Sequence, residues 1–310
     1  MKIAFAYAGQ GSQRTGMGKD LYENYESFKK VFDEDYIPET IKELCFFGPD
    51  EELNKTSNTQ PAMAAFAIGV TKVLKENNIV PDYAFGLSLG EYSALYCSGV
   101  FSEKDLMDVL SFRGARMQEE AEKSNTTMAA VLGLSSDKVL EACDEAKKAG
   151  KVFVANYNCP GQIVIGGEEE AVSFACDKAK ELGAKRGIKL SVSGAFHTEF
   201  MYPVAEKLGE KFQDIHFGEM NIPVVFNAVA RTKNDDENIK DLLKKQVYSS
   251  VYLEQSINFL IENGVDTIIE IGPGKALSGF VKKVNKEVKT FKIDKAEDLE
   301  EVINYFKEME

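Results

Sequence analysis

A serine between two glycines is the group best suited to covalent chemistry in this sequence. Residues 86–90 read Gly-Leu-Ser-Leu-Gly and match the G-x-S-x-G pattern of a nucleophile elbow, in which a strand reverses into a helix within one residue. Such a turn strains the serine backbone and projects its hydroxyl beyond the end of the sheet. A chance match in a glycine-containing turn is the alternative. The apolar run at 83–85 and the helical pattern at 91–97 favour the elbow, with Ser88 as nucleophile.

A serine nucleophile needs a base within hydrogen-bond reach, because its hydroxyl is a weak nucleophile at its own pKa. The chain contains only two histidines, His197 and His216. The surroundings of His216 are typical of a partly exposed strand or loop, whereas His197 lies in a glycine-bounded loop that is free to approach Ser88. We expect His197 to be the base. No acidic residue stands out as a third member of a triad, and a backbone carbonyl can orient the imidazole equally well.

A glycine-rich turn follows the first expected strand, residues 2–8. Residues 9–13 read Gly-Gln-Gly-Ser-Gln, but Arg14 stands where a dinucleotide fingerprint requires glycine, and no lysine follows at the P-loop position. The exposed N–H groups of such a turn are suited to holding an oxyanion. From this segment alone, a tight turn without a chemical role is an equally good interpretation.

Helical patterns dominate residues 20–78 and continue after the elbow. We expect Pro61 in the first turn of an apolar helix at 61–77 that packs against the elbow strand. A capping box at 102–105 opens the helix that carries Arg113 and Arg116. A helical arginine is usually a solvated or ion-paired surface charge, so helical position alone assigns neither arginine a role.

Residues 124–192 change character and form a unit of their own. The expected order of elements is the ferredoxin-like βαββαβ pattern. The expected strands are 128–134, 152–157, 162–165 and 186–192, and the expected helices are 137–148 and 168–182. The chain then returns to helices at 199–212, around 240–247 and at 294–310, with a strand pair near 222–228 and a strand before the glycine turn at 272–274. These patterns predict an α/β protein with an inserted subdomain.

Composition limits the class of protein. The 310 residues, 44% apolar and 28% charged, are typical of a soluble globular enzyme with one large domain and an insertion, or with two modest domains. The N-terminus lacks the apolar core of a signal peptide, and no run approaches the roughly 20 apolar residues of a membrane helix. Five scattered cysteines without a C-x-x-C pair indicate a reducing, cytoplasmic location and no zinc site. A formal charge of −13 argues against nucleic acid as the main partner.

Five motifs occur together and in order, at residues 9–13, 60–62, 86–92, 196–197 and 270–275. Their combination closely resembles the malonyl-CoA:acyl-carrier-protein transacylases of type II fatty acid synthesis, over essentially the whole chain. The resemblance implies an α/β-hydrolase-like core from residues 1–123 and 193–310, with a ferredoxin-like subdomain at 124–192. It also implies an acyltransferase that moves malonyl from malonyl-CoA to the pantetheine thiol of acyl carrier protein through a malonyl-serine.

The resemblance implies a role for each of three charged or nucleophilic side chains. Ser88 is the acylated nucleophile, His197 is its base, and Arg113 is the clamp on the malonyl carboxylate. Arg116, three residues along the same helix, is the competing candidate for the clamp. No metal or redox cofactor is implied, and the phosphopantetheine belongs to the carrier protein.

Further residues match family positions around the reacting atoms. The N–H groups of Gln10 and Leu89 would form the oxyanion hole, and the main-chain carbonyl of Gln246 would take the place of a triad carboxylate. Gln60 and Asn158 would line the site.

Two positions depart from the family pattern. Many members have histidine where this chain has Leu87, so no hydrogen bond to the malonyl carboxylate can come from that side chain. Many members also have proline where Ala8 stands, which affects the rigidity of the turn. Neither departure removes a group that the chemistry requires.

Two other functions remain open at this stage. A hydrolase built on the same elbow would release malonate to water, and a non-enzymatic scaffold for carrier proteins would have no use for Ser88 with His197. Because carrier proteins are acidic, we expect docking through a local basic patch, for which the candidates are Lys185, Arg186 and Lys189. An ordinary solvated face is an equally good interpretation of these three charges.

Overall fold

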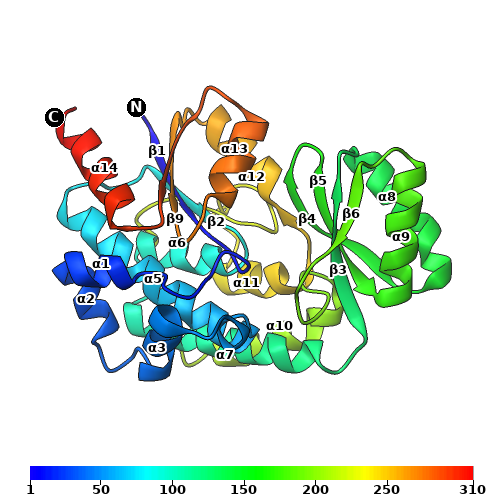
Figure 1. The fold of residues 1–310 in the computed structure, drawn as a ribbon, viewed down its shortest axis with the longest axis horizontal. Coiled ribbons are helices and arrows are strands. Elements are labelled where there is room, and N and C mark those ends of the chain that lie inside the picture. The colour runs from blue at the N-terminus through cyan, green and yellow to red at the C-terminus, as the bar shows by residue number, and fades with distance from the viewer. Residues whose placement is uncertain (310) are drawn as a thin grey trace.

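A computed structural model describes residues 1–309 as a mixed α/β protein with two five-stranded sheets (Figure 1). The first sheet is entirely parallel, in the order β10-β9-β1-β2-β7. Its strands are β1 (Ile3–Tyr7), β2 (Tyr83–Gly86), β7 (Val224–Val225), β9 (Thr267–Ile271) and β10 (Lys289–Ile293). Ala4 and Ala6 face one apolar cluster, and Phe5 and Tyr7 face another, so the sheet is buried on both faces. Parallel sheets are usually covered in this way.

Helices supply both covering layers of this sheet. One layer contains α5 (Thr56–Glu76), α6 (Leu89–Ser98) and α7 (Glu103–Ala121), and the other contains α12 (Leu253–Glu262) and α13 (Ala276–Val284). Further helices surround the first layer: α1 (Lys19–Asn24), α2 (Glu26–Phe32), α3 (Glu39–Phe47), α4 (Asp50–Leu53), α10 (Tyr202–Lys211), α11 (Ile239–Tyr248) and α14 (Ala296–Lys307). A 3₁₀ turn, η2 (Glu199–Met201), precedes α10.

The start of α5 differs from the sequence prediction. The helix begins at Thr56, so Pro61 lies inside the helix rather than in its first turn. Proline at this position cannot donate to the carbonyl of residue 57. Tertiary packing offsets that loss, because Thr59 Oγ1 donates to the Leu53 carbonyl at 2.7 Å and the first turn lies close to α7. A Cβ at Gly114 on α7 would come within 2.6 Å of the Thr56 carbonyl oxygen.

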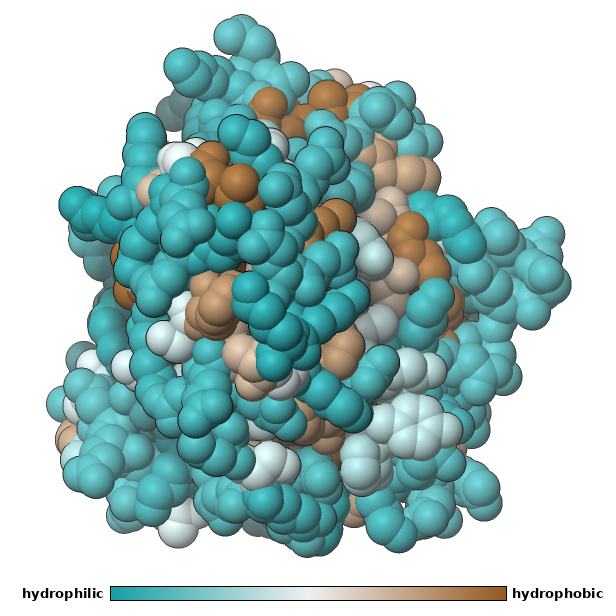
Figure 2. Space-filling model, turned by 90° about the vertical axis from the view of Figure 1, so that its right-hand side faces the viewer, coloured by the Kyte–Doolittle hydropathy of each residue, from teal (hydrophilic) through white to brown (hydrophobic). Residues whose placement is uncertain are grey.

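The second sheet has the order β6-β3-β5-β4-β8 and lies at the right of Figure 1. Its strands are β3 (Thr126–Leu132), β4 (Val152–Cys159), β5 (Gln162–Glu168), β6 (Arg186–Lys189) and β8 (Val251–Tyr252). All pairs are antiparallel except β4 with β8. One face packs on α8 (Ser136–Ala146) and α9 (Glu169–Glu181), with the 3₁₀ turn η1 (Lys147–Ala149) between α8 and β4. Figure 2 views the molecule from the right-hand side of Figure 1, where the second sheet lies, and the surface on that side is mainly hydrophilic with separate apolar patches.

Several short elements depart from the sequence prediction. The expected strand pair near 222–228 is the two-residue strand β7 followed by an isolated bridge between Phe226 and Arg231. The strands β8 and β10 were not predicted, because two residues show no periodicity and the pattern of Lys289–Ile293 is mixed. The last strand of the inserted unit ends at Lys189 rather than 192. Within residues 1–309, no helix combines the length and the apolar character needed to cross a membrane.

Candidate active site

The turn from β2 to α6 is a strained elbow. Ser88 has φ 56° and ψ −107°, a backbone conformation that residues other than glycine rarely adopt. The flanking glycines are required by close contacts: a Cβ at Gly86 would lie 2.1 Å from the Gly90 carbonyl carbon, and a Cβ at Gly90 would lie 2.2 Å from the Tyr7 carbonyl oxygen. This geometry places the Ser88 hydroxyl beside α6, at the carboxyl end of the parallel sheet.

His197 is held against this serine. Its Nε2 lies 2.7 Å from Ser88 Oγ, and its Nδ1 lies 2.8 Å from the main-chain oxygen of Gln246. A carbonyl only accepts, so Nδ1 carries the proton and Nε2 is left free to accept from the serine hydroxyl. Burial and the nearby charge of Arg113 lower the pKa of His197 to about 4, which keeps the imidazole neutral at physiological pH.

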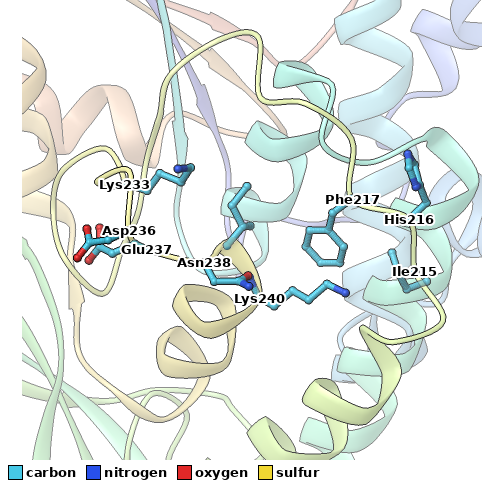
Figure 3. A pocket seen from close by; sticks show the side chains of 9 residues that line it. Ile215, His216, Phe217, Lys233, Asp236, Glu237, Asn238 and Lys240 are labelled. Atoms are coloured by element: carbon cyan, nitrogen blue, oxygen red, sulfur yellow. The ribbon is translucent and has the colours of Figure 1, made fainter.

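His216, the other histidine, lies outside this site. It is exposed on the loop after α10 and lines a surface hollow of about 660 Å³ with Phe217 and Lys240 (Figure 3). No hydrogen bond among residues 1–309 connects it to Ser88. The structure thus brings only one of the two histidines to the elbow.

Arg113 reaches Ser88 from the middle of α7. It is fully buried and donates to Ser88 Oγ at 3.2 Å, to Gln60 Oε1 at 2.8 Å and to Gln246 Oε1 at 3.1 Å. Its guanidinium also lies 5.1 Å from the ring centre of Tyr92. No carboxylate in residues 1–309 forms an ion pair with it. The amide oxygens orient the cation without neutralising it, which leaves its charge for an anionic ligand.

Arg116 points elsewhere although it lies on the same helix. Its side chain is 43% exposed and is paired with Glu119 on the surface. The helix therefore presents one arginine to the elbow and the other to solvent.

A cavity of about 150 Å³ opens above Ser88, between the two sheets. The core contributes Gln10, Leu87 and Met117, and the loop after β6 contributes Phe196 and His197. The opposite wall comes from the face of the second sheet that points away from α8 and α9, and from the segment after that sheet, namely Met128, Asn156, Asn158, Val164, Leu190 and Val192. The wall is mostly apolar, with two amide side chains.

Three of the remaining predicted site residues also lie at this cavity or border it. Asn158 is buried, and its Oδ1 has no hydrogen-bond partner within the part of the chain that the structure describes. Gln10 lies in the turn after β1 and lines the cavity, while its side chain donates to Thr56 Oγ1 at 3.0 Å. Leu89 is the first residue of α6, a position whose N–H has no partner within the helix.

Sequence reasoning missed some of the groups that hold the elbow. The side chain of Gln246 donates to the Ser88 carbonyl at 2.8 Å, in addition to the main-chain contact with His197. Asn227 Oδ1 accepts the Ser88 N–H, and the Glu91 carboxyl group accepts the N–H of Asn227. Glu91 is adjacent to the elbow motif, but no motif marks Asn227, which follows a strand of only two residues.

Comparisons with known proteins agree with this arrangement. The acyl transferase domain family matches residues 4–301. A malonyl CoA-acyl carrier protein transacylase of Bacillus subtilis (strain 168) is 46% identical over 310 residues, covering 99% of this chain and 98% of that protein. The crystal structure of the transacylase of the same name from Clostridium perfringens ATCC 13124 has a TM-score of 0.94 at 41% identity, covering 100% of this chain and 98% of that one.

A structural neighbour with a partner bound is equally similar. The matched chain belongs to the structure of a type II PKS acyl-carrier protein in complex with its malonyl-transacylase, and it has a TM-score of 0.95 at 35% identity, covering 98% of this chain and all of that one. The family predicted from the sequence motifs is confirmed. The chain belongs to the malonyl CoA-acyl carrier protein transacylases.

Proposed function

We propose that Ser88 accepts a malonyl group from malonyl-CoA and passes it to the pantetheine thiol of acyl carrier protein, supplying extender units for fatty acid synthesis. One observation carries this proposal. Ser88 Oγ lies within hydrogen-bond distance of both a neutral imidazole and a buried guanidinium, at 2.7 Å from His197 and 3.2 Å from Arg113. The imidazole can take the proton of a nucleophile, and the guanidinium can bind an anionic acyl group.

The first half-reaction acylates the enzyme. His197 Nε2 takes the hydroxyl proton while Ser88 Oγ attacks the thioester carbonyl carbon, and the main-chain oxygen of Gln246 stabilises the imidazolium. The N–H groups of Gln10 and Leu89 hold the negative oxygen of the tetrahedral intermediate. The carbon–sulfur bond then breaks, and coenzyme A leaves with the proton from His197.

The second half-reaction runs the same steps with a different thiol. The carrier-protein thiol gives its proton to His197 and attacks the malonyl-serine ester, and the proton returns to Ser88 Oγ as the ester breaks. The two thiols use the enzyme in turn, which makes the mechanism ping-pong. No step calls for a metal ion or a redox cofactor, and the phosphopantetheine arrives with the carrier protein.

Arg113 selects the acyl group. Gln60 and Gln246 orient it toward Ser88 Oγ without neutralising its charge, so the malonyl carboxylate supplies the counter-ion. Leu87 lines the cavity with an apolar side chain, so in this chain the selection rests on Arg113. Asn158, whose amide oxygen has no hydrogen-bond partner among residues 1–309, offers an acceptor to the amide groups of pantetheine.

The two sheets correspond, in this proposal, to an α/β-hydrolase-like core formed by residues 1–123 and 193–310 and a ferredoxin-like subdomain at 124–192. The β3-α8-β4-β5-α9-β6 order of residues 126–189 supports the second assignment. The strand β8 of the core pairs with β4, and Ser250 Oγ donates to the Val154 carbonyl at 2.6 Å. The core therefore extends the second sheet and fixes it over Ser88.

The partition of the malonyl group between thiol and water tests this function. Coenzyme A release from malonyl-CoA is followed with and without holo acyl carrier protein. We expect a burst of about one equivalent per enzyme without the carrier and continuing turnover with it. Steady release of free malonate at the same rate in both conditions would instead identify a hydrolase.

A further inference from the structure

A buried asparagine lies against the elbow but outside the cavity. Asn227 is fully buried, and it follows β7 in a closed turn in which Phe226 N–H donates to the Arg231 carbonyl at 3.0 Å and Ala230 N–H donates to the Phe226 carbonyl at 2.8 Å. This turn fixes the backbone that carries the side chain. Neither Asn227 nor its neighbours in the turn line the cavity above Ser88.

The side-chain amide of Asn227 bridges the two peptide groups on either side of Leu87. Its Oδ1 accepts the Ser88 N–H at 2.8 Å, and its Nδ2 donates to the Gly86 carbonyl at 2.7 Å. One acceptor and one donor are needed at once, and a primary amide supplies both in a plane.

Sheet topology explains why these two peptide groups need a side chain. The strand β7 pairs with β2 only as far as Phe85 with Val225, and then it turns away. On its other side, β2 keeps its partner one residue longer, because Leu87 N–H still donates to the Tyr7 carbonyl at 3.0 Å. The Gly86 carbonyl and the Ser88 N–H therefore face the side where the strand has ended. Asn227 continues the hydrogen-bonded ladder there with its side chain.

The backbone of Asn227 is held as firmly as its side chain. Its N–H donates to the carboxyl group of Glu91 on α6, and its carbonyl accepts the Tyr252 N–H at 3.0 Å. Glu91 is fully buried, and burial raises its pKa to about 8, against the opposing charge of Arg113. It is therefore an uncharged acceptor at neutral pH.

We propose that Asn227 is a positioning residue that holds Ser88 in its strained backbone conformation by bridging the Gly86 carbonyl and the Ser88 N–H, with Glu91 fixing Asn227. This inference rests on the proposed role of Ser88 as the nucleophile. A residue at φ 56° persists only when its surroundings determine that conformation. Releasing the bridge lets the serine relax away from His197, without removing any group that lines the cavity.

Two variants of Asn227 and one control test this role. Asn227→Ala removes the bridge, whereas Thr71→Ala removes two hydrogen bonds from an equally buried threonine that contacts Tyr7 and Ala67, outside the site. We measure single-turnover acylation by malonyl-CoA, inactivation by a fluorophosphonate that reacts with activated serines, and the Kd for malonyl-CoA. We expect Asn227→Ala to lower both rates by about 10²-fold and to change Kd by less than about threefold, because misplacing a reacting atom by about 1 Å has that effect on rate.

The outcomes separate this inference from the proposed function. If the wild-type protein forms no malonyl-serine, the proposed function fails. If the wild type is acylated and Asn227→Ala is acylated at the same rate, or loses rate only in proportion to Kd, the positioning role alone is overturned. If Thr71→Ala loses as much rate as Asn227→Ala, the loss comes from general destabilisation, and the positioning role is again overturned.

Asn227→Asp gives a readout that packing alone would not produce. When the new Asp side chain is ionised, its oxygen faces the Gly86 carbonyl, and two acceptors cannot form a hydrogen bond. When it is protonated, it can donate to that carbonyl as the amide does. Its burial beside Glu91 keeps the pKa of the new carboxyl above its usual range. The ratio of variant to wild-type acylation rate cancels the titration of His197, and we expect this ratio to rise as the pH falls from about 8 to 5. A ratio that is constant or falls over this range would contradict the bridge.

Discussion

The two sheets of this protein contribute to the site in different ways. Within residues 1–309, two buried side chains contact Ser88 Oγ: Arg113 from α7 beside the parallel sheet, and His197 from the loop after β6, which Gln246 on α11 holds in place. The antiparallel sheet packs one face on α8 and α9, and its other face contributes side chains such as Met128, Asn158 and Val164 to the cavity wall. We therefore expect the first sheet to determine the chemistry and the second to determine what fits above it.

This difference follows from how each sheet is covered. A sheet buried on both faces tolerates little change, because each side chain has neighbours on every side. The other face of the second sheet is also buried, and Met128 and Val164 join the main core, but its side chains at the cavity have space on one side. We therefore expect substitutions on the core side to lower the rate of acylation, and substitutions on the second sheet to alter substrate binding.

The largest effect is expected at His197. His197→Ala should slow acylation by about 10²–10⁴-fold, because it removes the imidazole that lies 2.7 Å from Ser88 Oγ. Single-turnover kinetics with malonyl-CoA measure this rate. His216→Ala is the control, and it should retain the wild-type rate since His216 lies on an exposed loop. Greater sensitivity of His216 would show that the base is assigned incorrectly.

Arg113 is the exception to this division between the sheets, because it lies in the core and yet we expect it to select the acyl group. Removing one partner of a buried charge pair costs about 2–5 kcal/mol, so Arg113→Ala should lower malonyl kcat/KM by roughly 10²-fold or more. Acetyl transfer should fall less, or rise, since acetyl has no carboxylate. The malonyl-to-acetyl ratio of kcat/KM is the measurement.

Arg116→Ala is the matched control for the clamp. Its side chain is 43% exposed and paired with Glu119, and such surface pairs contribute about 0–1 kcal/mol. The malonyl-to-acetyl ratio should stay at the wild-type value. An unchanged ratio in Arg113→Ala, or an equal change in both variants, would refute the clamp.

The pH dependence of acylation tests whether burial lowers the pKa of His197. An ordinary histidine has a pKa of about 6.5, and only the neutral form can accept the serine proton. Because burial and Arg113 lower the pKa of His197 to about 4, the acylation rate should stay nearly constant as the pH falls from about 7 to 5. Glu91 stays protonated throughout this range, since its pKa is about 8. A rate that halves near pH 6.5 would indicate a solvated imidazole instead.

The smallest effect is expected on the second sheet. Lys185, Arg186 and Lys189 are all exposed there, but Lys189 is already paired with Glu169. Arg186→Glu should raise the KM for acyl carrier protein by a few-fold, since rim charges act mainly on encounter, and should leave the KM for malonyl-CoA unchanged. Lys180→Glu, exposed on α9 and paired with Asp177, is the control. Equal effects on both substrates would argue against docking at this patch.

The sequence predicted those parts of the site that a local motif marks. The elbow, the glycine turn at 9–13 and the Phe196-His197 pair each lie within a few residues, so residue type and spacing were enough to assign Ser88 and His197. The choice of Arg113 over Arg116 depended on the family resemblance, because three residues along a helix do not decide which side chain is buried. The structure supplies the physical reason, which is that only Arg113 meets two glutamine side chains.

The parts that were missed depend on contacts between distant segments. Asn227 is 139 residues from Ser88, and it follows a strand too short to show a pattern. The strand β8 joins the second sheet from the core, so a division of the chain by sequence alone could not include it. The first turn of α5 formed before Pro61 because of its packing on α7, which outweighs local propensity.

Mass spectrometry of the protein after incubation with malonyl-CoA decides whether the elbow carries the acyl group. We expect a single malonyl adduct on the peptide that contains Ser88, lost on addition of holo acyl carrier protein and never formed in Ser88→Ala. The carrier protein should gain the malonyl group that the enzyme loses. An adduct on any other residue of the wild-type protein, or an undiminished adduct in Ser88→Ala, would contradict the proposed mechanism.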